Sequence, residues 1–309
     1  MDINSKIYVA GHNGMVGSAI LRHLKKEGYK NIIVRKSSEL NLKNQIDVNS
    51  FFQTIKPEYV FLAAARVGGI GANIKNPAVF LYDNLMINSN VINAAYESKV
   101  KKLLFLGSSC IYPRLSVQPM KEDYLLDGKL EPTNEGYALG KIVGIKLCQY
   151  YSKQYGCNFT SVMPPNLYGE NDNFSPEHSH VIAALIRKFH EGKINQHKEV
   201  IIWGTGNARR EFLYVDDAAE ACLYLMKNYN NSDHINIGSG EDISIYELAN
   251  IIKEVVGFKG EIVKDTSKPD GMPRKLMDNS RISSLGWRHK TSLEEGIRMT
   301  YEFFLDKYI

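Results

Sequence analysis

The feature that most constrains the fold is an apolar run that leads through three spaced glycines into an amphipathic stretch. Residues 6–10 form the apolar run, the glycines are Gly11, Gly14 and Gly17, and residues 18–27 follow with helical spacing. This order predicts a strand, a tight turn and a helix. The first glycine permits the turn, the second lets a pyrophosphate approach the backbone, and the third allows close packing of the helix. An ordinary strand–helix turn is the alternative, but the alternating pattern that follows favours a dinucleotide site.

Strand-length apolar runs recur after this unit, and segments with helical spacing separate them. The runs cover residues 59–63, 102–107 and 158–163, and two long helices are expected near 78–98 and 137–155. Strands that alternate with helices predict an α/β fold with a doubly wound parallel sheet. Boundaries of these elements are expected at Pro57, Pro77 and Pro132.

The composition of the chain changes after residue 163. Prolines and glycines become more frequent there, and the regular alternation gives way to short elements. We therefore expect a Rossmann-type dinucleotide-binding domain over residues 1–163 and a smaller α/β substrate domain over residues 164–309, with some later segments returning to the first domain. A chain of 309 residues is long enough for both.

Charge and hydropathy exclude several classes of protein. The net charge is +4, and the basic pairs Lys25-Lys26 and Lys101-Lys102 are interpreted as solvated surface charge. Without a larger basic cluster, no nucleic-acid partner is expected. No apolar stretch approaches the length of a membrane span, and the N-terminus lacks a signal pattern, so we expect a cytoplasmic protein without a membrane partner.

The four cysteines show neither the spacing of a zinc site nor that of a disulfide framework. We expect free thiols and no metal.

Two cations bear on the cofactor, because Arg35 and Lys36 follow the expected second strand, residues 31–34, where a site for NAD usually has an acidic residue. Cations there suit a 2′-phosphate and favour NADP(H). Asp47 is either a polar loop residue or an adenine contact, and the loop is the preferred interpretation.

The residues Tyr137 and Lys141 have the spacing of one helical turn, so they share a helix face. The lysine charge favours a tyrosinate and can also reach a nicotinamide ribose, and the tyrosine can protonate a carbonyl oxygen as hydride arrives. Ser108 ends an expected strand on the side where open parallel sheets bind ligands, and its hydroxyl can orient the same carbonyl. A surface pair is the alternative for Tyr137 and Lys141 alone. Together with the glycine turn and Ser108, the pattern indicates a carbonyl reductase.

Cys110 and His180 are candidates for acid–base chemistry beside that carbonyl. If the chain stays extended past Gly107, Ser108 and Cys110 project to the same side. A 4-keto group makes the protons on the adjacent sugar carbons acidic, so a thiolate can remove one and a histidine on the other face can return it. The alternatives are a small buried filler for the cysteine and a loop or core residue for the histidine.

The assembled motifs resemble the extended short-chain dehydrogenase/reductases, and within them the GDP-L-fucose synthase family. The likeness extends from about residue 6 to the C-terminus, and its further motifs are Ser-Ser-Cys-Ile-Tyr-Pro at 108–113, Glu-Pro-Thr-Asn-Glu at 131–135, Ser-His-Val-Ile at 179–182 and Lys-Pro-Asp-Gly at 268–271. The resemblance implies that GDP-4-keto-6-deoxy-D-mannose is epimerised at C3 and C5 and reduced at C4 with NADPH. It also implies a homodimer that pairs the two long helices into a four-helix bundle.

The resemblance assigns reduction to Ser108, Tyr137 and Lys141, and epimerisation to Cys110 and His180. The residues expected at the cofactor are Gly11, Asn13, Gly14, Met15, Val16, Gly17, Arg35, Lys36, Asn41, Leu42, Leu106, Gly107, Ser108, Lys141, Pro164, Pro165, Asn166, Leu167 and His180. Those expected at the GDP-sugar are Lys188, Trp203, Arg210 and Asp270. An arginine suits this role because its planar fork matches phosphate oxygens.

Five positions depart from the family pattern. Lys188 replaces an arginine, Pro165 a threonine and Gly136 a proline, while arginines are common in the family at Asn13 and Ser37. Because the changes surround the expected sugar and cofactor pockets, a C4-reductase of a GDP-linked 4-keto-6-deoxy-heptose, with little or no epimerisation, is an alternative. A 4,6-dehydratase is disfavoured by the absence of its acid pair after Ser108, and a regulatory nucleotide sensor by the presence of all three reductive residues.

Overall fold

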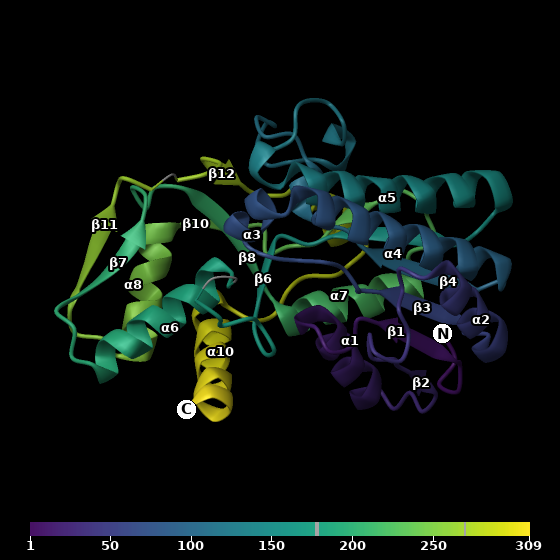
Figure 1. The fold of residues 1–309 in the computed structure, drawn as a ribbon, viewed down its shortest axis with the longest axis horizontal. Coiled ribbons are helices and arrows are strands. Elements are labelled where there is room, and N and C mark those ends of the chain that lie inside the picture. Colours follow the sequence, from purple (N-terminus) through teal and green to yellow (C-terminus); the bar gives the residue numbers. More distant parts are fainter. Residues whose placement is uncertain (177–178, 269) are drawn as a thin grey trace.

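The computed structural model describes residues 1–176, 179–268 and 270–309, so that Pro269 of the Lys-Pro-Asp-Gly motif lies outside the described residues. A six-stranded sheet, all of whose strand pairs are parallel, dominates the first part of the chain (Figure 1). Its strand order is β2 (Ile32–Ile33), β1 (Ile7–Ala10), β3 (Tyr59–Leu62), β4 (Lys102–Leu106), β5 (Phe159–Met163) and β9 (Ile235–Asn236). The predicted doubly wound α/β fold is confirmed.

Helices cover both faces of this sheet (Figure 1). They are α1 (Met15–Lys26) and α7 (Val215–Asn228) on one face, and α2 (Gln45–Ile55), α4 (Pro77–Glu97) and α5 (Glu135–Tyr155) on the other. Successive side chains of β1 serve the two layers in turn, because strand side chains alternate in direction. Ile7 and Val9 join the apolar core under α1 and α7, whereas Tyr8 and Ala10 join the core under α4 and α5.

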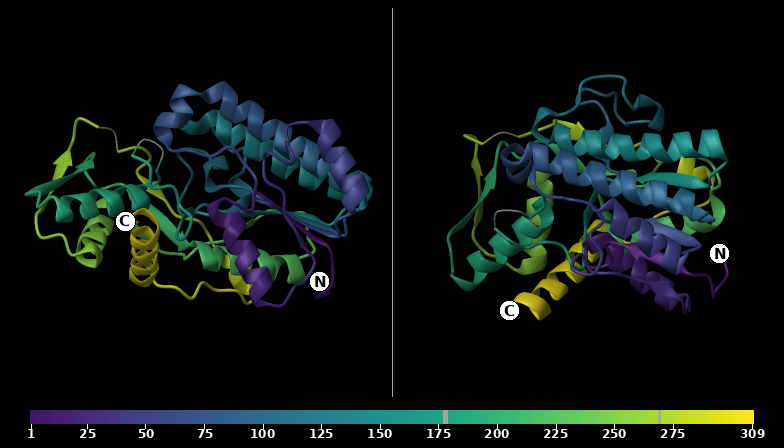
Figure 2. Two further views of the ribbon diagram at one scale, coloured as in Figure 1. Left: turned by 60° about the horizontal axis from the view of Figure 1, so that its bottom comes forward. Right: turned by 45° about the vertical axis from the view of Figure 1, so that its right-hand side comes forward.

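The helices α4 and α5 run side by side along the sheet (Figure 2). Small residues allow their close approach: a Cβ added to Gly140 would lie 2.9 Å from Cβ of Asn84, and Asn88 Nδ2 donates to Gly140 O at 3.0 Å. Gly136, where the family has proline, is equally tight, because an added Cβ would lie 2.7 Å from Pro77 O. The two helices therefore form one rigid layer.

The later half of the chain builds two smaller sheets and a third apolar core. β8 (Arg209–Tyr214) pairs with three strands, β6 (Asn166–Tyr168), β10 (Asp242–Ser244) and β12 (Arg274–Lys275). β7 (Glu199–Trp203) pairs with β11 (Glu261–Asp265). The remaining helices are α3 (Ile70–Lys75), α6 (Val181–Ile194), α8 (Ile245–Val256), α9 (Ser280–Ser284) and α10 (Leu293–Tyr308). Three short 3₁₀ helices complete the fold, η1 (Ser109–Ile111), η2 (Glu122–Tyr124) and η3 (Pro132–Asn134).

Two local expectations are wrong. Asp47 is not in a loop but in the first turn of α2, where Asn44 Oδ1 accepts hydrogen bonds from the N–H groups of Ile46 and Asp47. Lys102 is not a solvated charge, since only 3% of it is exposed. It begins β4 and lies beneath the end of α7, where backbone oxygens accept its hydrogen bonds. Within the described ranges, no helix is both long and apolar enough to cross a bilayer.

Candidate active site at the carboxyl ends of the parallel strands

The glycine turn joins β1 to α1 at the point where the strand order reverses between β1 and β3, which is where open α/β sheets bind ligands. Gly11 has φ +87°, and a Cβ there would lie 2.6 Å from Ala64 N. A Cβ at Gly17 would lie 2.1 Å from Gly11 O. Gly14 begins α1 without a side-chain hydrogen bond from the described residues. The free N–H groups of this helix end fit the pyrophosphate of a dinucleotide.

Of the two cations after β2, Lys36 lies near this turn, because its charge adds to the effect of burial in lowering the pKa of His12. Arg35 Nη1 donates to Val34 O at 2.8 Å, and its guanidinium lies 5.6 Å from the centre of the Phe51 ring. Lys36 is exposed, and its backbone N–H donates to Glu39 Oε2 at 2.7 Å. The guanidinium of Arg35 therefore packs on the Phe51 ring of α2. Lys36 is the more available of the two cations for a 2′-phosphate.

The other residues expected at the cofactor lie where neighbouring strands end. They are Asn13 in the glycine turn, Met15 and Val16 at the start of α1, Asn41 and Leu42 before α2, Leu106 and Gly107 at the end of β4, Pro164 and Pro165 after β5, and Asn166 and Leu167 in β6. The ends of β4 and β5 are tied together, because Ser109 N donates to Pro164 O at 3.1 Å. The structure thus brings the segments after β4 and β5 together at the carboxyl edge of the parallel sheet.

The first turns of α5 bring Tyr137 and Lys141 over the end of β4. Lys141 Nζ donates to Leu106 O at 2.6 Å and lies 5.9 Å from the centre of the Tyr137 ring. Burial lowers the pKa of Lys141 to about 7, which the charge of Cys110 opposes. Burial also raises the pKa of Tyr137, with the Cys110 charge adding to the shift and hydrogen bonding by Ser108 opposing it. Tyr137 is thus held in its protonated form, as an acid needs.

The expectation that the chain stays extended past Gly107 is wrong. β4 ends at Leu106, and η1 turns the backbone so that Cys110 N donates to Ser108 Oγ at 3.3 Å. The turn forms because Ser108 Oγ and Pro164 O offer acceptors to consecutive N–H groups. Ser108 and Cys110 still reach the same place, since both influence the pKa of Tyr137.

The thiol of Cys110 has two polar neighbours that the sequence did not indicate. Asn134 Nδ2, from η3, lies 3.3 Å from the sulfur, and Lys275 Nζ, from β12, lies 3.4 Å from it. Burial by itself raises the pKa of Cys110, but the charge of Lys275 and hydrogen bonds from Ser108, Lys275 and Asn134 leave it below its ordinary value. The site can therefore hold a thiolate.

His180 immediately precedes α6 and is oriented by a buried carboxylate. Its Nδ1 lies 3.3 Å from Asp172 Oδ1. The hydrogen bond that His180 makes to Asp172 raises the pKa of His180, burial lowers it, and the charges of Asp172 and Cys110 raise it further, so the net shift is upward. An imidazolium that can donate a proton is favoured. Asp172, like Asn134 and Lys275, was missed because neither spacing nor periodicity links it to its partner.

The four residues expected at the GDP-sugar fall into two groups. Trp203 is 64% exposed, and Lys188 Nζ lies 5.8 Å from the centre of its ring. Arg210 and Asp270 form the second group: burial lowers the pKa of Arg210, and the nearby charge of Asp270 offsets part of that shift. Asp270 also accepts hydrogen bonds from N and Oγ1 of Thr205, at 2.7 and 2.8 Å.

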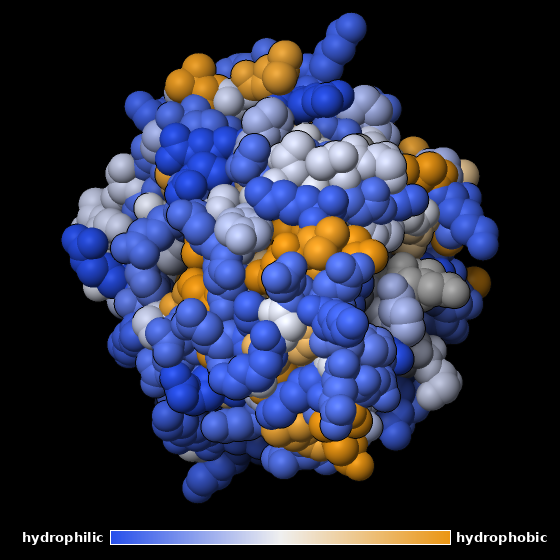
Figure 3. Space-filling view, turned by 90° about the vertical axis from the view of Figure 1, so that its left-hand side faces the viewer, coloured by the Kyte–Doolittle hydropathy of each residue, from blue (hydrophilic) through white to orange (hydrophobic). Residues whose placement is uncertain are grey.

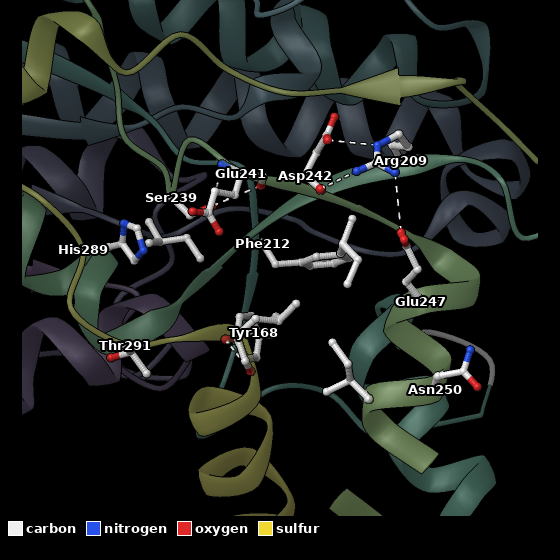
Figure 4. A pocket seen from close by; sticks show the side chains of 14 residues that line it. Tyr168, Arg209, Phe212, Ser239, Glu241, Asp242, Glu247, Asn250, His289 and Thr291 are labelled. Atoms are coloured by element: carbon white, nitrogen blue, oxygen red, sulfur yellow. Dashed lines mark hydrogen bonds and ion pairs between the residues drawn. The ribbon is translucent and has the colours of Figure 1, made fainter. Parts of the chain in front are cut away.

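A separate pocket of about 430 Å³ lies beside β8, β10 and α8 (Figure 4). Arg209 in its wall is paired with Asp242 and Glu247. None of the residues predicted for the active site is among the described residues that line this pocket, and its carboxylates disfavour a nucleotide.

The face of the molecule in Figure 3 is mostly hydrophilic with scattered apolar patches. No cluster of three His, Cys, Asp or Glu suited to a metal occurs in the described chain.

Comparisons with known proteins agree with this geometry. The model of the NAD dependent epimerase/dehydratase family matches residues 7–238. The chain is 57% identical over 309 residues to a putative GDP-L-fucose synthase 2 of Arabidopsis thaliana, covering 100% of this chain and 94% of the relative. It is 52% identical over 310 residues to the GDP-L-fucose synthase of Escherichia coli K12, covering 97% of each chain.

A solved structure of a GDP-mannoheptose C4 reductase from Campylobacter jejuni with NADP bound is also similar. Its sequence is 44% identical, the TM-score is 0.91, and the match covers 99% of both chains. The glycine turn, the reductive residues on α5 and the agreement over almost the whole chain lead to one assignment. The chain belongs to the NAD dependent epimerase/dehydratase family, among the GDP-L-fucose synthases and their relatives.

Proposed function

We propose that this protein converts GDP-4-keto-6-deoxy-D-mannose into GDP-L-fucose, by epimerisation at C3 and C5 and reduction at C4 with NADPH. The observation that supports this most is that Cys110 and the reductive residues share one electrostatic environment. The charge of Cys110 acts on the pKa values of Tyr137, Lys141 and His180. A plain reductase has no need of a thiolate and an imidazolium beside its carbonyl.

The proposed reduction uses the end of β4 and the face of α5. NADPH, when bound, supplies the hydride for C4. Ser108 orients the carbonyl oxygen, and Tyr137 gives that oxygen its proton. Lys141 has donors left after its bond to Leu106 O and can hold a ribose hydroxyl. The glycine turn fits the pyrophosphate, and Lys36 suits the 2′-phosphate.

The proposed epimerisation uses Cys110 and His180. The thiolate removes a proton from a carbon next to the ketone, and the imidazolium returns one to the opposite face of the ring. Trp203, Lys188 and Arg210 are proposed to hold the GDP moiety, the ring by stacking and the phosphates by charge. Under this proposal residues 1–163 carry mainly the cofactor, and residues 164–309 mainly the GDP-sugar.

The second candidate is a C4-reductase of a GDP-linked 4-keto-6-deoxy-heptose. It is favoured by Lys188, which offers a point charge where the family has a bidentate arginine and which donates to Ile201 O at 3.1 Å. Against it stands the greater identity to the GDP-L-fucose synthases, 57% and 52%, than to the heptose reductase, 44%. The fucose reaction is therefore the main proposal.

The deciding experiment follows NADPH consumption with freshly made GDP-4-keto-6-deoxy-D-mannose in deuterated buffer. NMR then gives the stereochemistry and the deuterium content of the product. GDP-L-fucose labelled at C3 and C5 supports the main proposal. Slow turnover, or an unlabelled product reduced only at C4, would instead favour the heptose reductase.

We also propose a homodimer in which α4 and α5 of two chains form a four-helix bundle. Large apolar side chains are exposed on both helices, among them Tyr82 at 59% and Tyr150 at 60%. Sedimentation at several concentrations tests this assembly. The proposed location is the cytoplasm, in agreement with four free thiols and a reduced cofactor.

A further inference from the structure

Lys275 lies beside the thiol of Cys110, although the two residues are 165 positions apart in the sequence. Nζ of Lys275 is 3.4 Å from the sulfur, and Nδ2 of Asn134 approaches the same atom at 3.3 Å. A cation and an amide donor both favour a negatively charged sulfur over a neutral thiol. This pair is not part of the reductive chemistry, because Ser108, Tyr137 and Lys141 suffice for that step.

The backbone that carries Lys275 is held on two sides. Parallel pairing of β12 with β8 fixes Lys275 itself. The next two N–H groups also have partners: Leu276 N donates to Gln118 Oε1 at 2.8 Å, and Met277 N donates to Glu211 Oε2 at 2.9 Å. The ammonium therefore extends toward Cys110 from a fixed base rather than from a free loop.

Other charged or titratable groups also face Cys110 from the surrounding elements. The pKa of each responds to the charge of Cys110: Tyr137 and Lys141 on α5, His180 before α6 and Arg210 on β8. Within the described parts of the chain, Lys275 is the cation that lies at hydrogen-bond distance from the sulfur. Its effect on the charge of Cys110 should therefore exceed that of the more distant cations.

We propose that Lys275 is a positioning residue for epimerisation, which keeps Cys110 as a thiolate ready to accept a proton from the sugar. The proposal rests on the proposed function, because it assigns a step of that reaction. It agrees with the balance at the sulfur, where burial raises the pKa of Cys110 but the Lys275 charge and the surrounding hydrogen bonds bring it below its ordinary value.

The step balances as a proton transfer in each direction. The thiolate takes the proton from the carbon next to the ketone, so an S–H bond forms, a C–H bond breaks, and the electron pair moves onto the carbonyl oxygen as an enolate. The His180 imidazolium then gives its proton to the opposite face of that carbon, and the electron pair returns to restore the C=O bond. A thiol and a neutral imidazole remain, and solvent exchange resets both.

The test titrates Cys110 in the free enzyme, without substrate. The rate of alkylation by iodoacetamide is measured on the Cys110 peptide by mass spectrometry across a range of pH. The variants are Lys275→Met, Lys275→Arg and, as a matched control, Arg274→Met, which removes the neighbouring cation of β12 that pairs with Asp242 instead. The pH profile of deuterium exchange at C3 and C5 is then compared with the rate of C4 reduction in each protein.

In Lys275→Met, the alkylation midpoint should move to higher pH, and the rate at neutral pH should fall about tenfold for every pH unit by which the midpoint rises. The rising limb of the exchange profile should move with it, while Lys275→Arg and Arg274→Met stay close to the wild type. An unchanged midpoint in Lys275→Met overturns the proposal. If that variant does not fold, a wild-type midpoint at or above that of an ordinary cysteine overturns it equally.

The two proposals fail in different ways. If the wild type makes no GDP-L-fucose, the proposed function fails, while the titration of Cys110 still reports on Lys275. If the product forms with deuterium at C3 and C5 but Cys110 titrates independently of Lys275, only the role of Lys275 is lost.

Discussion

The two ends of β4 each hold a buried lysine, and the two lysines are used differently. At the amino end, Lys102 Nζ donates to Leu225 O at 2.8 Å, to Tyr229 O at 2.6 Å and to Asn230 Oδ1 at 3.1 Å. An ammonium has three N–H donors, so this group is fully satisfied by the protein. It closes the carboxyl end of α7, where a helix leaves free carbonyls.

At the carboxyl end, Lys141 Nζ has Leu106 O as its hydrogen-bond acceptor within the described residues, at 2.6 Å. The rings of Phe105 and Tyr137 occupy two other sides, at 4.9 and 5.9 Å from their centres. Burial lowers the pKa of both lysines, to about 8 for Lys102 and about 7 for Lys141. Burial and a shifted pKa therefore do not distinguish the two lysines. The spare donors of Lys141 do, at the strand end where we propose that the cofactor binds.

The largest effect is expected from the loss of Tyr137, the proposed acid at the carboxyl end of β4. Tyr137→Phe removes the proton donor, so the rate of NADPH oxidation should fall about 10³-fold to 10⁴-fold. Deuterium exchange at C3 and C5 should continue, because Cys110 and His180 remain. The measurement is NADPH absorbance with NMR of the recovered sugar. Full reductase activity in this variant would remove Tyr137 from the mechanism.

The second largest effect is expected from the loss of Lys141, at the same end of β4. Lys141→Met should lower the rate of C4 reduction about 10²-fold, because a ribose hydroxyl and the tyrosine lose their cation. Near pH 7 the free energy of unfolding should change little, since a lysine whose charge is costly to bury is replaced by an apolar chain of similar length. Steady-state kinetics and urea unfolding of the same preparation measure both quantities. A large loss of stability with normal kinetics would reverse our distinction between the two ends.

Lys102, at the amino end of β4, should show the opposite behaviour. Lys102→Met removes the hydrogen bonds of Nζ and leaves Tyr229 O without the donor that it has in Lys102, so the free energy of unfolding should fall by about 1–3 kcal/mol. The kcat of the folded protein should stay near that of the wild type, because Lys102 lies at the amino end of β4 and Ser108 follows the opposite end. Urea unfolding and kinetics on the folded fraction test this. A catalytic defect without a stability defect would contradict it.

The smallest effect is a dependence of stability on pH. The pKa of Lys141 is about 7 in the native protein, against an ordinary value of 10.5. Between these values the unfolded chain binds a proton that the native protein lacks, so the stability of the cofactor-free protein should rise with pH. The rise relative to Lys141→Met should be about 1 kcal/mol per pH unit. Urea unfolding of both proteins near pH 7 and 9 shows whether the difference grows. A constant difference would mean that Lys141 is charged in the native state.

The sequence predicted the parallel sheet well, and also the common helix face of Tyr137 and Lys141, because both depend on local order. The glycine turn follows its strand directly, and Tyr137 and Lys141 share a helix face through their spacing alone. Errors arose where distant segments meet. Lys101 and Lys102 are adjacent and look alike, yet Lys101 is exposed and pairs with Glu58 while Lys102 is buried under α7. Only the packing of α7 on β4 separates them.

The sequence by itself determined the strand–turn–helix unit at the start of the chain and the common helix face of Tyr137 and Lys141, and it indicated a thiol near Ser108. The tertiary structure alone decided what surrounds that thiol. Lys275 reaches Cys110 because β12 pairs with β8 while η1 turns the chain after β4. Hydrogen bonds and ion pairs of this kind depend on distances of a few ångströms between segments far apart in the chain, and no local pattern encodes them.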